Sequence, residues 1–219
     1  MSAIRVAVVD DQALFVSGMQ MLVESQPDFE FAGSATTGRS GVELAARAEP
    51  HIVLMDIRMP GMDGIEATAQ IVGPGSTSRV IILTTFHRDE AVFRAIRAGA
   101  SGFITKDATP EFILGAIRTV HGGQAVLAPT ATFDLVKQFA TPPSDSGRPL
   151  ELAIEVLTPR EREIFLLVAR GLTNVEVASA AFVSEATAKT HIRSILSKLG
   201  LQSRIQVVIF AYENGLLEY

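Results

Sequence analysis

HIVLMDIRMPGMDG, residues 51–64, is the stretch of this sequence that decides the fold. Its uninterrupted apolar run, Ile52–Met55, is typical of a parallel strand that is covered on both faces. The run ends in Asp56, and a loop that contains proline and glycine leads into a helical pattern over 64–72. A buried strand followed by a helix is the unit from which α/β sheets are built.

The same unit recurs along the first 120 residues. The pattern predicts strands over residues 4–9, 29–34, 51–55, 80–84 and 102–105. It predicts helices over residues 12–25, 39–48, 64–72, 88–98 and 109–121. Alternation of this period implies βαβ units, so we expect a doubly wound, five-stranded parallel sheet of the α/β class.

Four of the apolar runs end in reactive polar residues. In chain order these residues are Asp10 and Asp11, then Asp56, then Thr84 with Thr85, and finally Lys106. In an open parallel sheet the carboxyl ends of the strands share one edge, where ligands bind. Any one of these residues alone is more often a turn former, a cap or a solvated side chain. Their joint occurrence in order favours one shared site.

The residue types at that edge suit a divalent cation and a phosphoryl group. Carboxylate oxygens of Asp10, Asp11 and Asp56 can bind Mg²⁺, which prefers oxygen ligands in octahedral geometry. The cation would relieve the repulsion among the carboxylates and neutralise an incoming phosphoryl group. Asp56 could then attack phosphorus to form an acyl phosphate. Lys106 would hold phosphoryl oxygens as a point charge, and Thr84 could hydrogen-bond another.

Composition narrows the classes of protein. The chain has no cysteine, which excludes disulfides, thiolate metal sites and cysteine nucleophiles. No apolar run approaches the roughly 20 residues that span a bilayer, and the N-terminus shows no signal-peptide pattern, so we expect a cytoplasmic protein without a membrane partner. A length of 219 residues suits two domains.

A linker divides the chain. Residues 129–140 could form one more helix, and Thr141–Pro149 combines proline, glycine and serine without an apolar pattern. We therefore predict a domain over 1–125, a helix and linker over 126–150, and an all-α domain over 151–219.

The pattern beyond the linker is purely helical. Thr158-Pro159-Arg160-Glu161 and Thr173-Asn174-Val175-Glu176 both read as capping boxes, which start helices. Ser184 can cap a third helix that Gly200 would end, and a fourth runs over about 203–214. Two short helices joined tightly, Asn174–Ala181 and Ser184–Leu199, predict a helix-turn-helix in a four-helix domain.

The helix over 184–199 has two unlike faces. Its apolar stripe consists of Ala188, Ile192, Ile195, Leu196 and Leu199. Its opposite face carries Thr187, Thr190, Arg193, Ser194 and Ser197, with Lys189 and His191 on the flanks. A small, polar and cationic face is what a helix in the major groove requires, although a solvated amphipathic helix would look similar. The net charge of −5 argues against non-specific nucleic-acid binding, but Ser184–Arg204 holds four cations against one acid.

Residues 1–121 resemble the receiver domain of two-component response regulators. The resemblance is carried by Asp10-Asp11, by LMDIRMPGMDG around Asp56, by ILTTF with Thr84, and by GASGFITKD with Lys106. It implies a flavodoxin-like fold, Asp56 as phosphoacceptor, and Asp10, Asp11, Asp56 and the backbone carbonyl of Arg58 as Mg²⁺ ligands. It also implies that Thr84 and Lys106 sense a phosphoryl group donated by a sensor histidine kinase. Phe103 stands where many receivers have tyrosine, so it is either a switch residue or an ordinary packed aromatic.

Residues 157–217 resemble the LuxR/NarL (FixJ) type of helix-turn-helix. The matching stretches are LTPREREIFLLVARGLTNVEVA, VSEATAKTHIRSILSKLGLQSRIQVV and AYENGLL. By position, Lys189, Thr190 and Arg193 would face the bases of double-stranded DNA. Thr187, His191 and Lys198 would contact backbone phosphates or support the helix.

The two resemblances together imply a transcription factor controlled by phosphorylation, which is not itself an enzyme beyond phosphotransfer and slow self-dephosphorylation. Phosphorylation would promote a homodimer through a receiver face and the last helix. Because the linker Thr141–Pro149 is short, we also expect the unphosphorylated receiver to pack against the helical domain and partly mask Lys189–Arg193. One alternative is a Mg²⁺-dependent phosphatase of the haloacid dehalogenase type, which Arg58 disfavours because those enzymes carry aspartate there. Another alternative is a signalling adaptor whose helical domain binds protein.

Overall fold

The computed structural model describes residues 3–73, 76–85, 89–126 and 154–216, and it divides the chain into two compact units between Ala128 and Pro129. The expected helix over 129–140 and the linker Thr141–Pro149 lie outside the described residues. Among the described helices, none has the length and apolar character needed to span a membrane.

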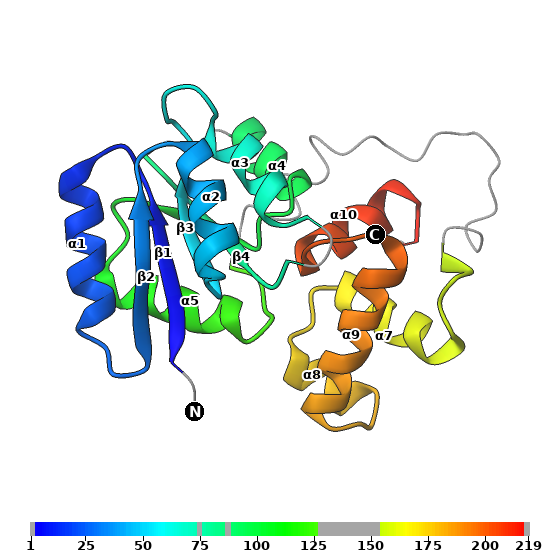
Figure 1. Cartoon of the computed structure of the whole chain (residues 1–219). Helices are drawn as coiled ribbons and strands as arrows, with labels where there is room; N and C mark the ends of the chain where they lie inside the picture. Colours follow the sequence, from blue (N-terminus) through cyan, green and yellow to red (C-terminus); the bar gives the residue numbers. More distant parts are fainter. Residues whose placement is uncertain (1–2, 74–75, 86–88, 127–153, 217–219) are drawn as a thin grey trace. The chain divides into compact units, whose positions relative to one another are not determined.

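The first unit is the predicted α/β sheet (Figure 1). Five parallel strands lie in the order β2-β1-β3-β4-β5, and they are β1 (Ile4–Val9), β2 (Phe29–Ala35), β3 (Ile52–Asp56), β4 (Arg79–Thr84) and β5 (Gly102–Thr105). The helices are α1 (Ala13–Glu24), α2 (Gly38–Ala48), α3 (Gly64–Ile71), α4 (Asp89–Arg97) and α5 (Pro110–His121). Each predicted strand and helix of this unit is confirmed, with small differences at the ends.

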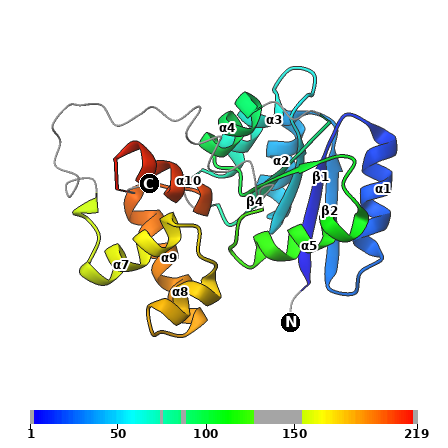
Figure 2. The ribbon, with the colours of Figure 1, turned by 180° about the vertical axis from the view of Figure 1, so that it is seen from behind.

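Helices cover both faces of the sheet, as Figures 1 and 2 show from opposite sides, and an apolar core lies on each face. Val53 and Met55 of β3 pack with α2, α3 and α4 on one face. Ile52 and Leu54 of the same strand pack with α1 and α5 on the other face. The apolar run in β3 is continuous because consecutive side chains of this central strand enter different cores.

The loop after β3 is held close to the end of that strand. A Cβ atom on Gly64 would lie 1.8 Å from the backbone oxygen of Asp56, so only glycine fits at this approach. The backbone amide of Gly64 also donates to the carbonyl of Ile57 at 2.9 Å. The Asp63 carboxylate caps α3 by accepting from the amides of Ile65 and Glu66. This packing places the first turn of α3 directly against the end of β3.

The second unit consists of helices around one apolar core. The helices are α7 (Pro159–Ala169), α8 (Asn174–Ala180), α9 (Glu185–Leu199) and α10 (Arg204–Glu213). The capping boxes predicted at Thr158 and Thr173 are both formed, and Gly200 ends α9 in the left-handed conformation with φ of 68°. The predicted stripe of α9 is confirmed, because Ala188, Ile192 and Ile195 are buried in this core.

Candidate functional site

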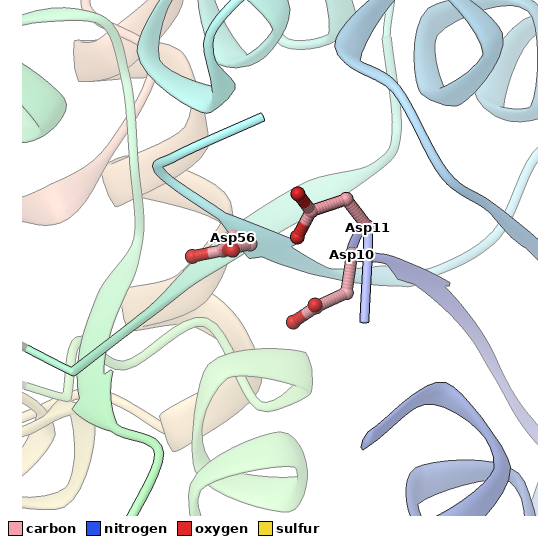
Figure 3. A group of neighbouring side chains, drawn as sticks. All are labelled: Asp10, Asp11 and Asp56. Carbon is pink, nitrogen blue, oxygen red and sulfur yellow. The ribbon is translucent and has the colours of Figure 1, made fainter. Parts of the chain in front are cut away.

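The carboxyl edge of the sheet brings three carboxylates together (Figure 3). Asp10 and Asp11 directly follow β1, and Asp56 is the last residue of the neighbouring strand β3. One carboxylate oxygen from each residue lies within 4.8 Å of the others. Asp10 and Asp56 are buried, whereas Asp11 is exposed. The predicted convergence of these side chains is confirmed.

One ammonium group bridges the two buried carboxylates. Lys106 Nζ lies 2.6 Å from Asp10 Oδ2 and 3.0 Å from Asp56 Oδ2, and the lysine side chain is only 7% exposed. Asp10 Oδ1 accepts from the backbone amide of Gln12 at 2.9 Å, which leaves its Oδ2 for cations. Lys106 Nζ also lies 4.8 Å from the centre of the Phe15 ring in α1.

The charges in this cluster do not balance among the residues that the structure describes. There, three carboxylates face the Lys106 ammonium, so a surplus of negative charge remains when all three are ionised. Burial raises the pKa of Asp56, although Lys106 and the backbone amide of Arg58 act in the opposite direction. A hard divalent cation would supply the missing positive charge, and the donor set consists of the oxygen ligands that Mg²⁺ prefers. The cluster therefore fits Mg²⁺.

The remaining predicted residues of the edge lie around this cluster. Thr84 ends β4 and is buried, and its carbonyl accepts from the backbone amide of Lys106 at 2.8 Å. Phe103 in β5 is half-buried and packs against the core that α2, α3 and α4 share. Whether Phe103 also has a switch role stays a prediction, as does the assignment of the Arg58 carbonyl as a metal ligand.

In the second unit, α9 presents most of the predicted DNA-contacting residues to solvent. Thr187, Lys189, Thr190 and Arg193 are exposed, and His191 is partly exposed. Lys189 forms an ion pair of 2.8 Å with Glu185 one turn earlier, an exposed pair that DNA can displace at little cost. The polar face expected of a major-groove helix is thus available in this unit.

Two residues of α9 turn toward α7 instead: Ser194, which the sequence predicts on the polar face, and Lys198, which the resemblance predicts to contact phosphates or support the helix. Ser194 Oγ donates to Glu161 Oε1 at 2.6 Å, and Lys198 Nζ donates to Glu161 Oε2 at 2.6 Å. The expectation that Ser194 lies on the outward face is therefore wrong, because a buried carboxylate of the neighbouring helix requires its hydroxyl. The role of Lys198 at DNA stays a prediction, but the structure gives its ammonium an internal partner.

The sequence pattern predicts Glu161 only as the glutamate of the capping box that starts at Thr158. Its carboxylate also accepts from the amide and hydroxyl of Thr158, as a capping box requires. The hydrogen bonds from Lys198, Ser194 and Thr158 lower the pKa of Glu161 to about 2, in that order of influence. The capping pattern identified the residue, but no local signal indicated its contact with α9.

Arg204 is, after Lys198, the second of the four cations counted in Ser184–Arg204 that has a partner in another part of this unit. Its guanidinium donates to the Asn174 side chain at 2.9 Å and to the carbonyl of Leu172. Burial lowers the pKa of Arg204 to about 10. Two of the four cations in Ser184–Arg204 thus bond to other helices of this unit, Lys198 to Glu161 and Arg204 to Asn174, whereas Lys189 and Arg193 are exposed on α9.

Comparison with known proteins accounts for both units. Residues 6–118 match the family model of the response regulator receiver domain, and residues 155–211 match that of the bacterial regulatory proteins of the luxR family. The chain is 38% identical to the transcriptional regulatory protein YxjL of Bacillus subtilis (strain 168), over 98% of each chain. It is 39% identical to the transcriptional regulatory protein LiaR of the same organism, over 98% of this chain and 99% of that one.

A solved structure agrees with these matches. The response regulator ChrA of a heme-sensing two-component system aligns with a TM-score of 0.50 and 30% identity, over 99% of this chain and 100% of that chain. The protein therefore belongs to the two-component response regulators, and it joins a receiver domain to a DNA-binding domain of the luxR family.

Proposed function

We propose that Asp56 accepts a phosphoryl group from a phosphohistidine of a sensor histidine kinase. A carboxylate oxygen of Asp56 forms the new bond to phosphorus, while the bond from phosphorus to the histidine nitrogen breaks. The electron pair of that bond stays on the imidazole, which takes up a proton as it leaves. The observation that carries this proposal is the position of the Lys106 ammonium, 3.0 Å from the carboxylate that would become the acyl phosphate.

The other residues of the edge have distinct tasks. Asp10, Asp11 and Asp56, with the carbonyl of Arg58, would hold Mg²⁺, which supplies charge neutralisation for the transferred group. Lys106 exchanges a carboxylate partner for a phosphoryl oxygen. Thr84 hydrogen-bonds another phosphoryl oxygen, and movement of Thr84 transmits the change to β4 and to Phe103.

The output is sequence-specific binding of double-stranded DNA by a homodimer. With Lys198 and Arg204 engaged internally, one copy of the domain offers few cations to the phosphates, so one copy binds weakly. In α10 the apolar residues Ile205, Val208, Ile209 and Tyr212 follow the i, i+3, i+4, i+7 spacing of one helical face. Val207 and Ala211, on the opposite face, belong to the domain core. Ile205, Val208 and Ile209 are buried in the structure, so the proposed contact between two copies requires the face of α10 that begins at Ile205 to become exposed.

The test measures oligomeric state and DNA affinity of the full chain, with and without beryllofluoride and Mg²⁺. We expect dimerisation and tighter DNA binding with the phosphoryl mimic, and neither change in Asp56→Asn. Asp11→Asn is a second control, because it removes a carboxylate from the cluster but keeps the phosphoacceptor. Identical behaviour with and without the mimic would contradict the proposal.

The phosphatase alternative has its own signature. Steady multiple-turnover hydrolysis of small phosphoesters, lost in Asp56→Asn, would support an enzyme rather than a switch. We expect no more than a single turnover per chain on the time scale of phosphotransfer.

A further inference from the structure

Phe15 is a residue of the phosphoryl edge to which neither the sequence motifs nor the proposed chemistry assigns a role. It lies in the first turn of α1, is half-buried, and packs against the core between the sheet and α5. The centre of its ring is 4.8 Å from Lys106 Nζ. An ammonium at this distance over an aromatic face is attracted by the negative potential of the ring.

The ring completes the surroundings of the ammonium. Lys106 has Asp10 and Asp56 as its two charged partners, and its side chain is 7% exposed. The loop that orients Asp10 also starts α1, because the Gln12 amide donates to Asp10 Oδ1. Phe15 is therefore placed by the same short segment that places the carboxylate.

From this arrangement we propose that Phe15 is a positioning residue, whose ring keeps the Lys106 ammonium beside Asp56 when Asp10 is engaged by Mg²⁺. The inference rests on the proposed phosphotransfer function of this site. In the structure two carboxylates hold the ammonium, and the ring is one partner of three. Once Asp10 Oδ2 serves a metal, Asp56 and the ring are the two of these partners that Lys106 keeps. The contact with the ring then disfavours side-chain rotamers that would carry the Lys106 ammonium into solvent before the phosphoryl group arrives.

A neutral ring suits this role better than a third anion would. It attracts the ammonium without offering a strong hydrogen-bond acceptor, so the lysine N–H groups remain available for phosphoryl oxygens. It also excludes water from one side of the ammonium, which strengthens the remaining electrostatic contacts.

The role predicts opposite effects on two ligands when the ring is weakened. In such a variant Mg²⁺ alone should bind at least as tightly as in the unmodified protein. The reason is that Lys106, once it is held less firmly, competes less with Mg²⁺ for the Asp10 carboxylate. Beryllofluoride at saturating Mg²⁺ should bind more weakly, by about 3- to 10-fold for loss of the aromatic face. A purely structural defect would weaken both ligands together.

The experiment replaces Phe15 in the full chain with mono-, di- and trifluorinated phenylalanine, which keep the shape of the ring but progressively withdraw its negative potential. We expect the logarithm of the beryllofluoride dissociation constant to rise steadily along this series. Phe15→Tyr should retain the affinity for beryllofluoride, and Phe15→Leu should weaken it by about 3- to 10-fold. The same fluorinated series at Phe31, which packs against the same core from β2, is the matched control and should change nothing.

A second readout does not depend on phosphoryl chemistry. In the metal-free protein, the ε-methylene protons of Lys106 should show an upfield ring-current shift in the NMR spectrum, and this shift should vanish in Phe15→Leu. No ring-current shift, no trend along the fluorinated series, or a parallel loss of Mg²⁺ and beryllofluoride would each overturn the role of Phe15. Failure of the unmodified protein to bind beryllofluoride would overturn the proposed phosphotransfer function instead, and the shift of Lys106 would still report on the contact.

Discussion

The ammonium of Lys198 in α9 lies 2.6 Å from the buried carboxylate of Glu161 in α7. Ser194, one turn earlier in α9, donates to the other oxygen of the same carboxylate. Glu161 is itself fixed by the capping box at the start of α7. Hydrogen bonds therefore hold one side of α9, the proposed recognition helix, against α7, and we expect this contact to set the orientation of α9 at DNA.

The salt dependence of DNA affinity can show whether Lys198 mainly bonds Glu161 within the domain or contacts a DNA phosphate. A lysine on a phosphate contributes about 0.9 to the slope of log affinity against log salt. We expect Lys198→Gln to lower the thermal stability of the helical domain and to leave this slope unchanged. A slope reduced by about one contact, with stability intact, would instead make Lys198 a phosphate ligand.

The network around Glu161 predicts a dependence of stability on pH. The pKa of Glu161 is about 2 in the folded domain against 4.5 for the free side chain, so its ionised form stabilises the fold above about pH 4.5. This contribution is lost as pH falls from there toward 2. Glu161→Gln should therefore be less stable than the parent protein at pH 7, and the difference should narrow across that acidic range. A difference that is constant with pH would show that the charge of Glu161 is unimportant.

Gly64 should not tolerate a side chain, since its added Cβ would lie 1.8 Å from the carbonyl oxygen of Asp56. We expect Gly64→Ala to lower the free energy of unfolding by about 1–3 kcal/mol, because backbone must move to relieve the overlap. Beryllofluoride binding should weaken as well, since the displaced atom belongs to the phosphoacceptor. Gly115→Ala is the control. Its Cβ would meet nothing within 4 Å on the exposed side of α5, so the substitution should stabilise the fold by about 0.4–1 kcal/mol.

Lys189 and Arg193 are exposed cations of α9 and should carry base recognition. Replacing either by alanine should cost about 1–3 kcal/mol of discrimination between the preferred site and random DNA. Arg47→Ala removes an equally exposed cation from α2 and should leave discrimination unchanged. If both α9 variants kept full discrimination in a competition assay, the output would be a protein contact, as in an adaptor.

Masking of Lys189–Arg193 by the unphosphorylated receiver stays a prediction, because it depends on the linker outside the described residues. We expect the helical domain alone to bind DNA more tightly than the unphosphorylated full chain, and addition of beryllofluoride to the full chain to close the gap. Binding titrations on one DNA duplex measure both, and equal affinities would exclude masking.

Several features could be read from the chain because they are local. The continuous apolar run Ile52–Met55 predicts a central parallel strand, since both of its faces need burial. Aspartates at the ends of two such runs predict a shared edge, because parallel strands bring their carboxyl ends together. Threonine three residues before glutamate predicts each helix start at Thr158 and Thr173, because the cap bonds lie within one turn. Each pattern lies within one element, and the shared edge follows once the strands are known to be parallel.

Partners between elements could not be read in this way. The period of α9 places Ser194 and Lys198 on its polar side, but only the packing of α9 on α7 brings Glu161 within reach of both. Arg204 counted as surface charge until the structure placed its guanidinium against Asn174 and Leu172. No local pattern around Phe15 indicates that its ring lies beside Lys106, which is 91 residues further along the chain.

The amino-acid sequence by itself thus determined the strands, the helices, their order and the carboxylates at the sheet edge, because periodicity and capping are set by neighbours along the chain. Only the tertiary structure decided which cation meets which anion and which ring covers Lys106. Those pairings depend on how the helices pack against their neighbours. That packing results from many side-chain contacts between segments far apart in the sequence.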